Sequence, residues 1–234
     1  MKKLALLTLI VFTLSSCLTV KMATGEVVEQ TMTIDGDIDA LALSSGFDVI
    51  VDRSIPHGEV RIATHSDMFD KLDIYVKGTT LNISLNSHEL QAKTLEVRIP
   101  EYAYNTLAIS GGADFYWHGC TAPSFTLAAS GGADVEMEGS FEELCIAASG
   151  GADLEISGIT TTLRASASGG ADLSLDELLA ENVEVSASGG ADVEVCALSS
   201  ITVNASGGAD VCYGGDPATK DIECSGGASV QHAR

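Results

Sequence analysis

Ser110-Gly111-Gly112-Ala113-Asp114 is the stretch that decides the fold, because the same phrase returns along the rest of the chain. Later copies begin at Ser130, Ser149, Ser168, Ser188 and Ser206, and a last copy, Ser225–Ser229, ends in Ser instead of Asp. The spacings between copies are 20, 19, 19, 20, 18 and 19 residues. So regular a period is the signature of an architecture built from stacked repeats.

The residues around each phrase alternate between apolar and polar types, as β-strands with one buried side do. When the Ser of the phrase is counted as zero, positions −3, +5 and +7 are predominantly apolar, and the Ala at +3 shares their side. The Asp at +4 points the other way, as does the frequent Glu at +6 (Glu136, Glu155 and Glu194). Gly-Gly permits positive φ and a sharp corner. Each repeat therefore reads as a strand, a corner, a second strand and a variable loop.

Stacking of the repeats is required, because a unit this small cannot bury its apolar side alone. A coil of about 19 residues suits an all-β, right-handed parallel β-helix, or solenoid, in which each strand pairs with its equivalent one coil on, about 4.8 Å away. The alternative is an antiparallel β-sandwich made of hairpins. Hairpins do not require the same residue type at the same phase of every repeat, so we predict the β-helix over residues 107–234.

Residues 31–106 are predicted to form an N-terminal β region that holds the first, irregular coils. Period-two alternation predicts five strands there: 47–51, 60–63, 72–76, 81–85 and 95–99. The stretch Leu41–Val51 has the same pattern as Leu107–Trp117. It is interpreted as a degenerate first copy, so the stacking should begin well before Ser110.

The N-terminus has the features of a secretory signal. Met1-Lys2-Lys3 precedes an apolar run from Leu4 to Leu14, which is too short to span a membrane. Leu14-Ser15-Ser16-Cys17 resembles the lipobox of bacterial lipoproteins. That resemblance implies a signal peptide over residues 1–16, lipid on Cys17 and stable anchoring by several acyl chains. Residues 17–30 would then be a tether, and Leu18 favours the outer membrane; an ordinary signal peptide with an incidental Cys is the alternative.

The charge of the chain limits its partners. Loss of Lys2 and Lys3 with the leader leaves 10 basic and 33 acidic residues, a net charge near −23. Such a body should repel nucleic acid, whereas a glycan, a surface protein or a divalent metal remains a possible ligand. The other cysteines occur at different phases of the repeat, so they indicate no disulfide framework and are interpreted mainly as small apolar fillers. They are Cys120, Cys145, Cys196, Cys212 and Cys224.

Stacked coils would align the aspartates of the phrase in one column: Asp114, Asp134, Asp153, Asp172, Asp192 and Asp210. Neighbouring carboxylates about 5 Å apart repel by about 1 kcal/mol in bulk water and about 3 kcal/mol at an effective dielectric of 20. The favoured interpretation is that each Asp accepts hydrogen bonds from backbone N–H groups at the corner and faces water. The alternative is a ladder of Ca²⁺ sites, completed by Glu136, Glu155 and Glu194. No other cofactor is predicted.

Catalysis is not predicted, because a catalytic site normally departs from a repeat whereas these acids are the repeat. Glycosidases on β-helices use paired carboxylates, often with a cation. The repeat region has only Arg164, Lys220 and Arg234 as basic residues. Tyr116 should point outward, where an aromatic ring can stack on a sugar, although structural packing is the favoured interpretation.

Several features together resemble the family of putative auto-transporter adhesins with a head GIN domain. They are the lipobox, the strand leading to Val97-Arg98-Ile99-Pro100, the stretch Leu107–Asp114 and the Ser-Gly repeats that follow. The resemblance implies a solenoid-like all-β fold in a cell-envelope protein. We therefore predict a lipid-anchored, non-enzymatic protein that presents a rigid acidic face for binding or adhesion. A carbohydrate-active β-helix enzyme and a self-assembling envelope scaffold are the alternatives.

Overall fold

The computed structural model describes residues 21–86 and 90–233, so the predicted leader and Cys17 lie outside the described residues. The strands are β1 (Lys21–Met22), β2 (Val27–Thr33), β3 (Ala40–Leu43), β4 (Asp48–Val51), β5 (Glu59–His65), β6 (Leu72–Lys77), β7 (Thr80–Leu85), β8 (Leu90–Gln91), β9 (Leu95–Ile99), β10 (Thr106–Ser110), β11 (Asp114–Gly131), β12 (Asp134–Gly150), β13 (Asp153–Gly169), β14 (Asp172–Ala187), β15 (Asp192–Ala205), β16 (Asp210–Gly214), β17 (Thr219–Cys224) and β18 (Ser229–His232). A single 3₁₀ turn, η1 (Phe69–Lys71), is the helical element within these ranges. Among the described residues, no helix has the length and hydropathy needed to cross a membrane.

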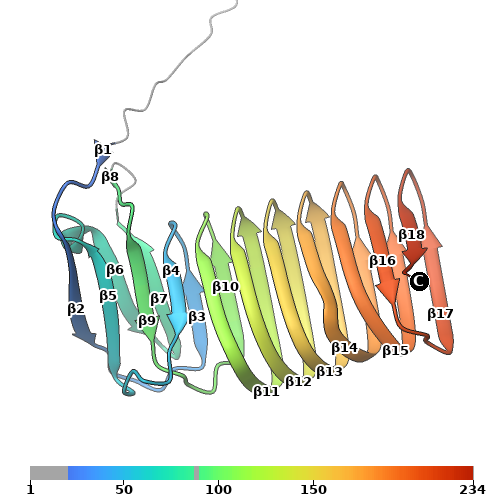
Figure 1. The fold of residues 1–234 in the computed structure, drawn as a ribbon, viewed down its shortest axis with the longest axis horizontal. Coiled ribbons are helices and arrows are strands. Elements are labelled where there is room, and N and C mark those ends of the chain that lie inside the picture. Colours follow the sequence, from blue (N-terminus) through green and yellow to red (C-terminus); the bar gives the residue numbers. More distant parts are fainter. Residues whose placement is uncertain (1–20, 87–89, 234) are drawn as a thin grey trace, which may run out of the picture.

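The chain winds into an all-β parallel solenoid, which confirms the predicted fold class (Figure 1). Each of the long strands β11 to β15 makes almost a full coil and pairs in parallel with the next. The register places phrase on phrase, with Asp114 beside Asp134 and Ser130 beside Ser149. The sandwich alternative is therefore wrong for the repeat region, because each strand pairs with its equivalent in the neighbouring coil rather than with a hairpin partner.

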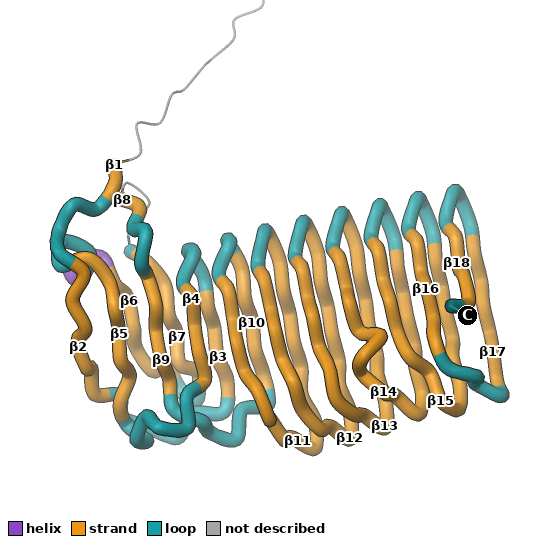
Figure 2. Tube along the Cα trace, in the orientation of Figure 1, coloured by secondary structure: helices purple, strands orange, loops and turns teal. Residues whose placement is uncertain are grey.

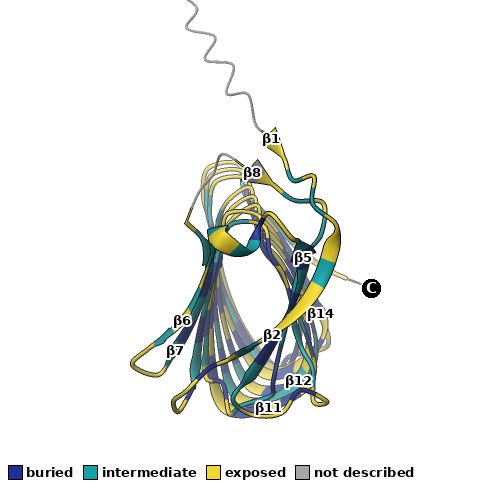
Figure 3. Cartoon of the chain, turned by 90° about the vertical axis from the view of Figure 1, so that its left-hand side faces the viewer, coloured by how far each residue is buried: buried dark blue, intermediate teal, exposed yellow. Residues whose placement is uncertain are grey.

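Each coil is flattened, with a tight edge at the Gly-Gly corner and a wide edge opposite (Figures 2 and 3). We call the residues that follow a corner the first arm of a coil, and those that lead up to the next corner the second arm. The wide edge accommodates the variation in repeat length, because register shifts occur there between Glu155 and Gly158 and between Leu175 and Leu179. The spacing of 18 to 20 residues is thus compatible with strict alignment of both arms.

The tight edge explains why glycine recurs in the phrase. Gly150 has φ +80°, and a Cβ placed on it would lie 3.0 Å from the backbone N of Gly131 in the preceding coil. The second glycine supplies a hydrogen bond between coils, since Gly151 N–H donates to the carbonyl of Gly131 at 2.7 Å. In the degenerate first copy the equivalent of the first glycine is Ser45, which has φ 74°. The corner therefore requires a backbone conformation that favours glycine.

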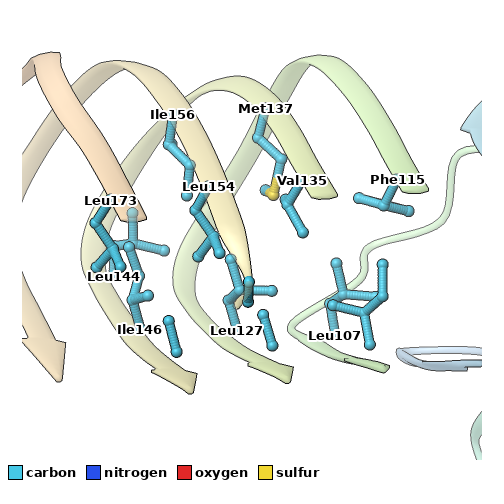
Figure 4. Packing of buried hydrophobic residues seen from close by; sticks show 14 of the residues in the cluster. Leu107, Phe115, Leu127, Val135, Met137, Leu144, Ile146, Leu154, Ile156 and Leu173 are labelled. Carbon is cyan, nitrogen blue, oxygen red and sulfur yellow. The ribbon is translucent and has the colours of Figure 1, made fainter. Parts of the chain in front are cut away.

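The core consists of the columns that the alternation predicts to point inward (Figure 4). At position −3 the buried residues are Leu107, Leu127, Ile146, Ala165, Val185 and Val203. At +5 they are Phe115, Val135, Leu154, Leu173, Val193 and Val211, and at +7 Trp117, Met137, Ile156, Leu175, Val195 and Tyr213. The last coil differs, because Ile222 remains 38% exposed and His232 is exposed. The inward columns are confirmed in every coil but the last.

The N-terminal region contains the five predicted strands as β4, β5, β6, β7 and β9, and it also contains the predicted first copy. Leu41 on β3 lies beside Leu107, and Asp48 on β4 lies beside Asp114. Antiparallel pairs occur here as well, between β2 and β5, β5 and β9, and β6 and β7. Residues 27–30 were expected in the tether but form the first half of β2. They are held there because β2 pairs along all of β5 and Met32 packs against the core.

Candidate functional site

The first arms carry an uninterrupted column of carboxylates on the outer surface. The register sets each Asp of the phrase beside that of the next coil, and it adds Asp48 at one end and Ser229 at the other. The predicted residues are all brought together: Asp114, Asp134, Asp153, Asp172, Asp192 and Asp210. Exposed Glu136, Glu155 and Glu194 stand two residues further along their strands. We call these two columns the acidic face.

Two aspartates of the acidic face have raised pKa values. Burial, followed by the charges of Asp134 and Asp48, raises the pKa of Asp114 from 3.8 to about 6. Burial, then Asp153 and Asp192, raises the pKa of Asp172 as well. Neighbouring carboxylates in the column therefore make Asp114 and Asp172 harder to ionise. Beside this face lies His118, whose Nε2 is 3.5 Å from a carboxylate oxygen of Glu136.

The aspartates do not accept hydrogen bonds from the corner, so that interpretation is wrong for the described coils. The backbone N–H of Asp153 donates to the carbonyl of Ala133 at 3.0 Å, and the N–H of Asp172 donates to that of Ala152 at 2.9 Å. Corner N–H groups are thus used in stacking one coil on the next. The second half of the interpretation holds, because the carboxylates from Asp134 onward are exposed to water.

Calcium would need a larger set of ligands than one column supplies. Ca²⁺ takes six to eight oxygen ligands. Within residues 21–86 and 90–233, no three side chains of His, Cys, Asp or Glu are grouped so that they could hold a metal ion. The Ca²⁺ ladder stays a prediction, and the arrangement of the described side chains does not favour it.

A shallow hollow interrupts the acidic face beside Tyr116. Its volume is about 340 Å³, and its lining comprises Tyr116, Asp134, Val135, Glu136, Asp153, Leu154, Glu155, Asp172 and Ser174. Tyr116 points outward, as predicted, while its neighbours Phe115 and Trp117 are buried. Burial and the surrounding carboxylates raise the pKa of Tyr116, so the phenol keeps its proton at neutral pH. The hollow combines an aromatic ring with several hydrogen-bond acceptors.

The second arms present a face of opposite character, which we call the Ser/Ala face. Its first column is the Ser of the phrase, and its second column, two residues earlier, is Ala108, Ala128, Ala147, Ser166, Ser186 and Asn204. Together they line an open trough of about 920 Å³ that runs across the coils. No charged side chain lines it. This trough was not predicted from the sequence, although the small residues that recur at positions −2 and 0 of the repeat indicate it.

The wide edge has a third surface that the sequence did not indicate. Ile159, Leu179 and Leu198 are each about half exposed there, along a hollow of about 500 Å³. These residues lie in the variable loops, where the repeat period carries no information about side-chain direction.

The cysteines differ in environment. Cys120 is buried, as a small apolar filler should be, whereas Cys224 is exposed. Cys145, Cys196 and Cys212 are partly buried on the outer side of their strands. The filler interpretation therefore holds for Cys120 and is wrong for the others, because their phases place them outside the inward columns or at the exposed last coil.

Comparison with known proteins agrees with the solenoid. The family model described as "putative auto-transporter adhesin, head GIN domain" matches residues 37–217. A putative adhesin of Bacteroides fragilis has 17% identity, with 91% of this chain and 99% of that chain covered and a TM-score of 0.83. A putative lipid binding protein of Parabacteroides distasonis has 17% identity, the same coverage and a TM-score of 0.70. A putative adhesin of Parabacteroides merdae has 15% identity, with 91% and 98% covered and a TM-score of 0.67. Identities this low show a shared fold alone, and no protein of curated function matches the chain.

Proposed function

This chain belongs to the putative auto-transporter adhesin, head GIN domain family, and from that membership we propose that it is a lipid-anchored, non-enzymatic binding or adhesion protein of the cell envelope. The observation that carries the proposal is the uniformity of the acidic face. The same carboxylate stands at the same place in successive coils, on a backbone held by hydrogen bonds between coils. A rigid, repeated surface suits binding better than a single reaction.

The hollow beside Tyr116 is the part of the acidic face that best fits a ligand. Carboxylates accept hydrogen bonds from sugar hydroxyl groups, and an aromatic ring packs against the apolar side of a sugar. Tyr116 supplies the ring, and Asp134, Asp153 and Asp172 supply acceptors on neighbouring coils. A neutral or cationic glycan therefore fits the chemistry of this surface, whereas an anionic one would be repelled.

A glycan and surface-protein array tests the binding role. The full chain should bind one class of neutral or cationic ligand, and Tyr116→Ala and Asp153→Asn should each weaken binding at least about tenfold. Ser149→Ala on the Ser/Ala face is the matched control and should leave binding unchanged. Absence of any binding would count against adhesion. Loss of binding in the control alone would show that the ligand binds the Ser/Ala face instead of the acidic face.

The anchor is tested separately, because Cys17 lies outside the described residues. Lipid on Cys17 predicts that the chain is recovered with the membranes of its cell and that Cys17→Ser releases it. Recovery of the Cys17→Ser chain with the membranes would contradict anchoring by lipid on Cys17. The outer membrane is the expected location, and fractionation of the two membranes checks it.

A carbohydrate-active enzyme remains the competing function. Turnover of a polysaccharide that is lost when one acid is changed, but kept when its neighbours in the column are changed, would favour the enzyme. Because each Asp of the column has an equivalent in the next coil, we expect no such singular residue.

A further inference from the structure

We propose that the C-terminal end of the solenoid is an interface with a second copy of this chain, related by a two-fold axis that runs along the strand direction. The interface consists of the last coil, β17 and β18. It lies beyond the last aspartate of the acidic face and away from the hollow beside Tyr116, so it goes beyond the proposed binding function.

The last coil offers open strand edges and incompletely covered apolar side chains. In the described part of the chain, β17 pairs only with β15 and β18 only with β16. One edge of each strand therefore has backbone N–H and C=O groups without a strand partner. Every residue of β17 is exposed, and Ile222, which occupies an inward column, is 38% exposed. Val230 on β18, also in an inward column, is only partly buried. Open edges with apolar neighbours are natural sites for strand pairing.

A two-fold axis along the strands sets β17 of one copy beside β18 of the other and keeps the tight edges together. Because the strands run in opposite directions on the two arms, both new pairs are antiparallel. Inward residues must oppose inward residues, and an axis along the strands also sets residues at the same distance from the tight edge opposite one another. Ile222 and Val230 are each four residues from Gly226 at the corner, so Ile222 lies opposite Val230 of the second copy. The same contact occurs twice by symmetry, as in any isologous interface, and the assembly closes at two copies.

The outward residues explain why this end can approach a second copy despite the charge of the protein. β18 reads Ser-Val-Gln-His, so neither outward position carries the carboxylate that stands on the preceding first arms. In the register above, Glu223 of one copy lies opposite Ser229 of the other, and Asp221 lies opposite Gln231. Each acid thus meets a neutral hydrogen-bonding side chain instead of another acid. A like-charge pair directly opposite would have been destabilising.

The inward positions of the last coil nearest the wide edge are held within their own copy. His232 stacks on Tyr213, with ring centroids 4.8 Å apart, and its Nε2 lies 2.7 Å from the carbonyl oxygen of Gly215. The ammonium of Lys220 lies 5.7 Å from the centroid of the Tyr213 ring. These contacts lie near the wide edge and leave Ile222 and Val230, with Cys224 and Ala228 beside them, as the apolar surface near the tight edge.

The opposite end of the solenoid is built differently. There the antiparallel strands β2 and β6 form the edges, and Ile34, Ile38 and Met68 are buried beneath them and the adjoining loops. β2 and β6 also carry exposed Glu29, Asp73 and Lys77, together with exposed apolar Val27 and Tyr75. Because β17 carries charged residues as well, charge on the edge strands does not distinguish the two ends. The proposal therefore rests on the register at the C-terminal end, and new protection on β2 and β6 would indicate head-to-tail stacking instead.

Sedimentation of the full chain in density-matched detergent tests the interface. We expect a monomer–dimer equilibrium at concentrations up to about 100 μM, where micromolar dissociation constants are detected. Ile222→Glu introduces a charge at the centre of both symmetric contacts and should raise the dissociation constant at least about 100-fold. Val230→Glu should do the same from the other arm. Leu198→Glu is the matched control, because Leu198 is 47% exposed at the wide edge, and it should leave the dimer unchanged.

Hydrogen exchange locates the contact and checks that the variants fold. Amides of β17 and β18 should exchange more slowly at high than at low concentration in the unaltered chain, and this difference should vanish in Ile222→Glu. Amides of β12 and β13 should be protected equally in all variants. A monomer at every concentration, a dimer that survives both glutamate substitutions, or new protection on β2 and β6 would each overturn the proposal.

Discussion

The acidic face and the Ser/Ala face belong to the same coils and cover the same core, yet they differ in nearly every outward property. Both arms pair in parallel with strict register, and both place apolar residues inward at period two. One arm then presents a column of carboxylates, in which neighbouring charges raise the pKa of Asp114 and Asp172. The other arm presents hydroxyl and methyl groups along an uncharged trough. The difference shows that the inward residues and the corners determine the stacking of the coils. The outward residues do not determine it, and stacking aligns them in columns whatever their chemical type.

The largest expected effect comes from the corner that joins the two faces. Gly150→Ala should lower the free energy of unfolding by about 2–3 kcal/mol, because the left-handed conformation disfavours a Cβ and the preceding coil leaves it little room. Gly151→Ala is the matched control, since its Cβ would lie 3.6 Å from the carbonyl oxygen of Gly131, an ordinary van der Waals contact. It should change stability by less than about 1 kcal/mol. Urea unfolding of both variants measures the difference, and equal losses would mean that the corner does not depend on the first glycine.

The acidic face should make stability depend on pH in the direction opposite to ordinary acid denaturation. The pKa of Asp114 is about 6 in the folded chain against 3.8 for an unperturbed carboxyl. Between these values the folded chain binds more protons than the unfolded chain, so the free energy of unfolding should rise as pH falls from 7 to 5. After allowance for solvent screening, Asp114 should contribute about 1 kcal/mol or less to this rise.

Urea midpoints at pH 5 and pH 7 check the sign, and Asp114→Asn should flatten the dependence. Below about pH 4 the trend should reverse, because Asp52 and Glu101 have lowered pKa values and lose their hydrogen-bonded, ionised state. A chain that is less stable at pH 5 than at pH 7 would contradict the interaction of carboxylates along the column.

A smaller effect on stability should distinguish a carboxylate within a column of carboxylates from a single carboxylate on a neutral surface. Asp153→Asn removes the repulsion with both neighbours in the column and should stabilise the chain by about 1 kcal/mol at low salt, and by less at high salt. Ser149→Asp places one carboxylate on the Ser/Ala face, between the uncharged Ser130 and Ser168. It should change stability by less than about 0.5 kcal/mol. If the two substitutions changed the thermal midpoint by similar amounts, the expected electrostatic difference between the two faces would be contradicted.

Calcium should have the smallest effect. In the described chain, no three His, Cys, Asp or Glu side chains are grouped so that they could bind a metal ion. The thermal midpoint should therefore be nearly the same in millimolar Ca²⁺ and in EDTA at matched ionic strength. Specific binding would instead raise the midpoint with the concentration of the ion. A rise of several degrees that is lost in Asp153→Asn would establish the calcium ladder.

Much of the fold could be predicted because the same pattern of apolar, polar and glycine residues recurs in every repeat. Leu127, Ile146 and Val185 recur at one phase, and each is buried. The degenerate copy around Asp48 was also recognisable, since β4 keeps the pattern of β11. The part of the tether that became β2 was not recognisable, because Val27–Thr33 is held by pairing with a strand more than 20 residues away. Pairing of that kind leaves no period in the sequence.

By itself the sequence determined the coil, the inward columns and the alignment of the aspartates, because identical units that stack in register bring identical positions together. Only the tertiary structure decided what the outward columns became. It showed that corner N–H groups bond to the preceding coil and leave the aspartates to water, and that Asp114 is partly buried beside two other acids. It also showed the trough, the hollow at Tyr116 and the open last coil. These features depend on distances and desolvation between residues about one coil apart, which a linear pattern of residue types does not contain.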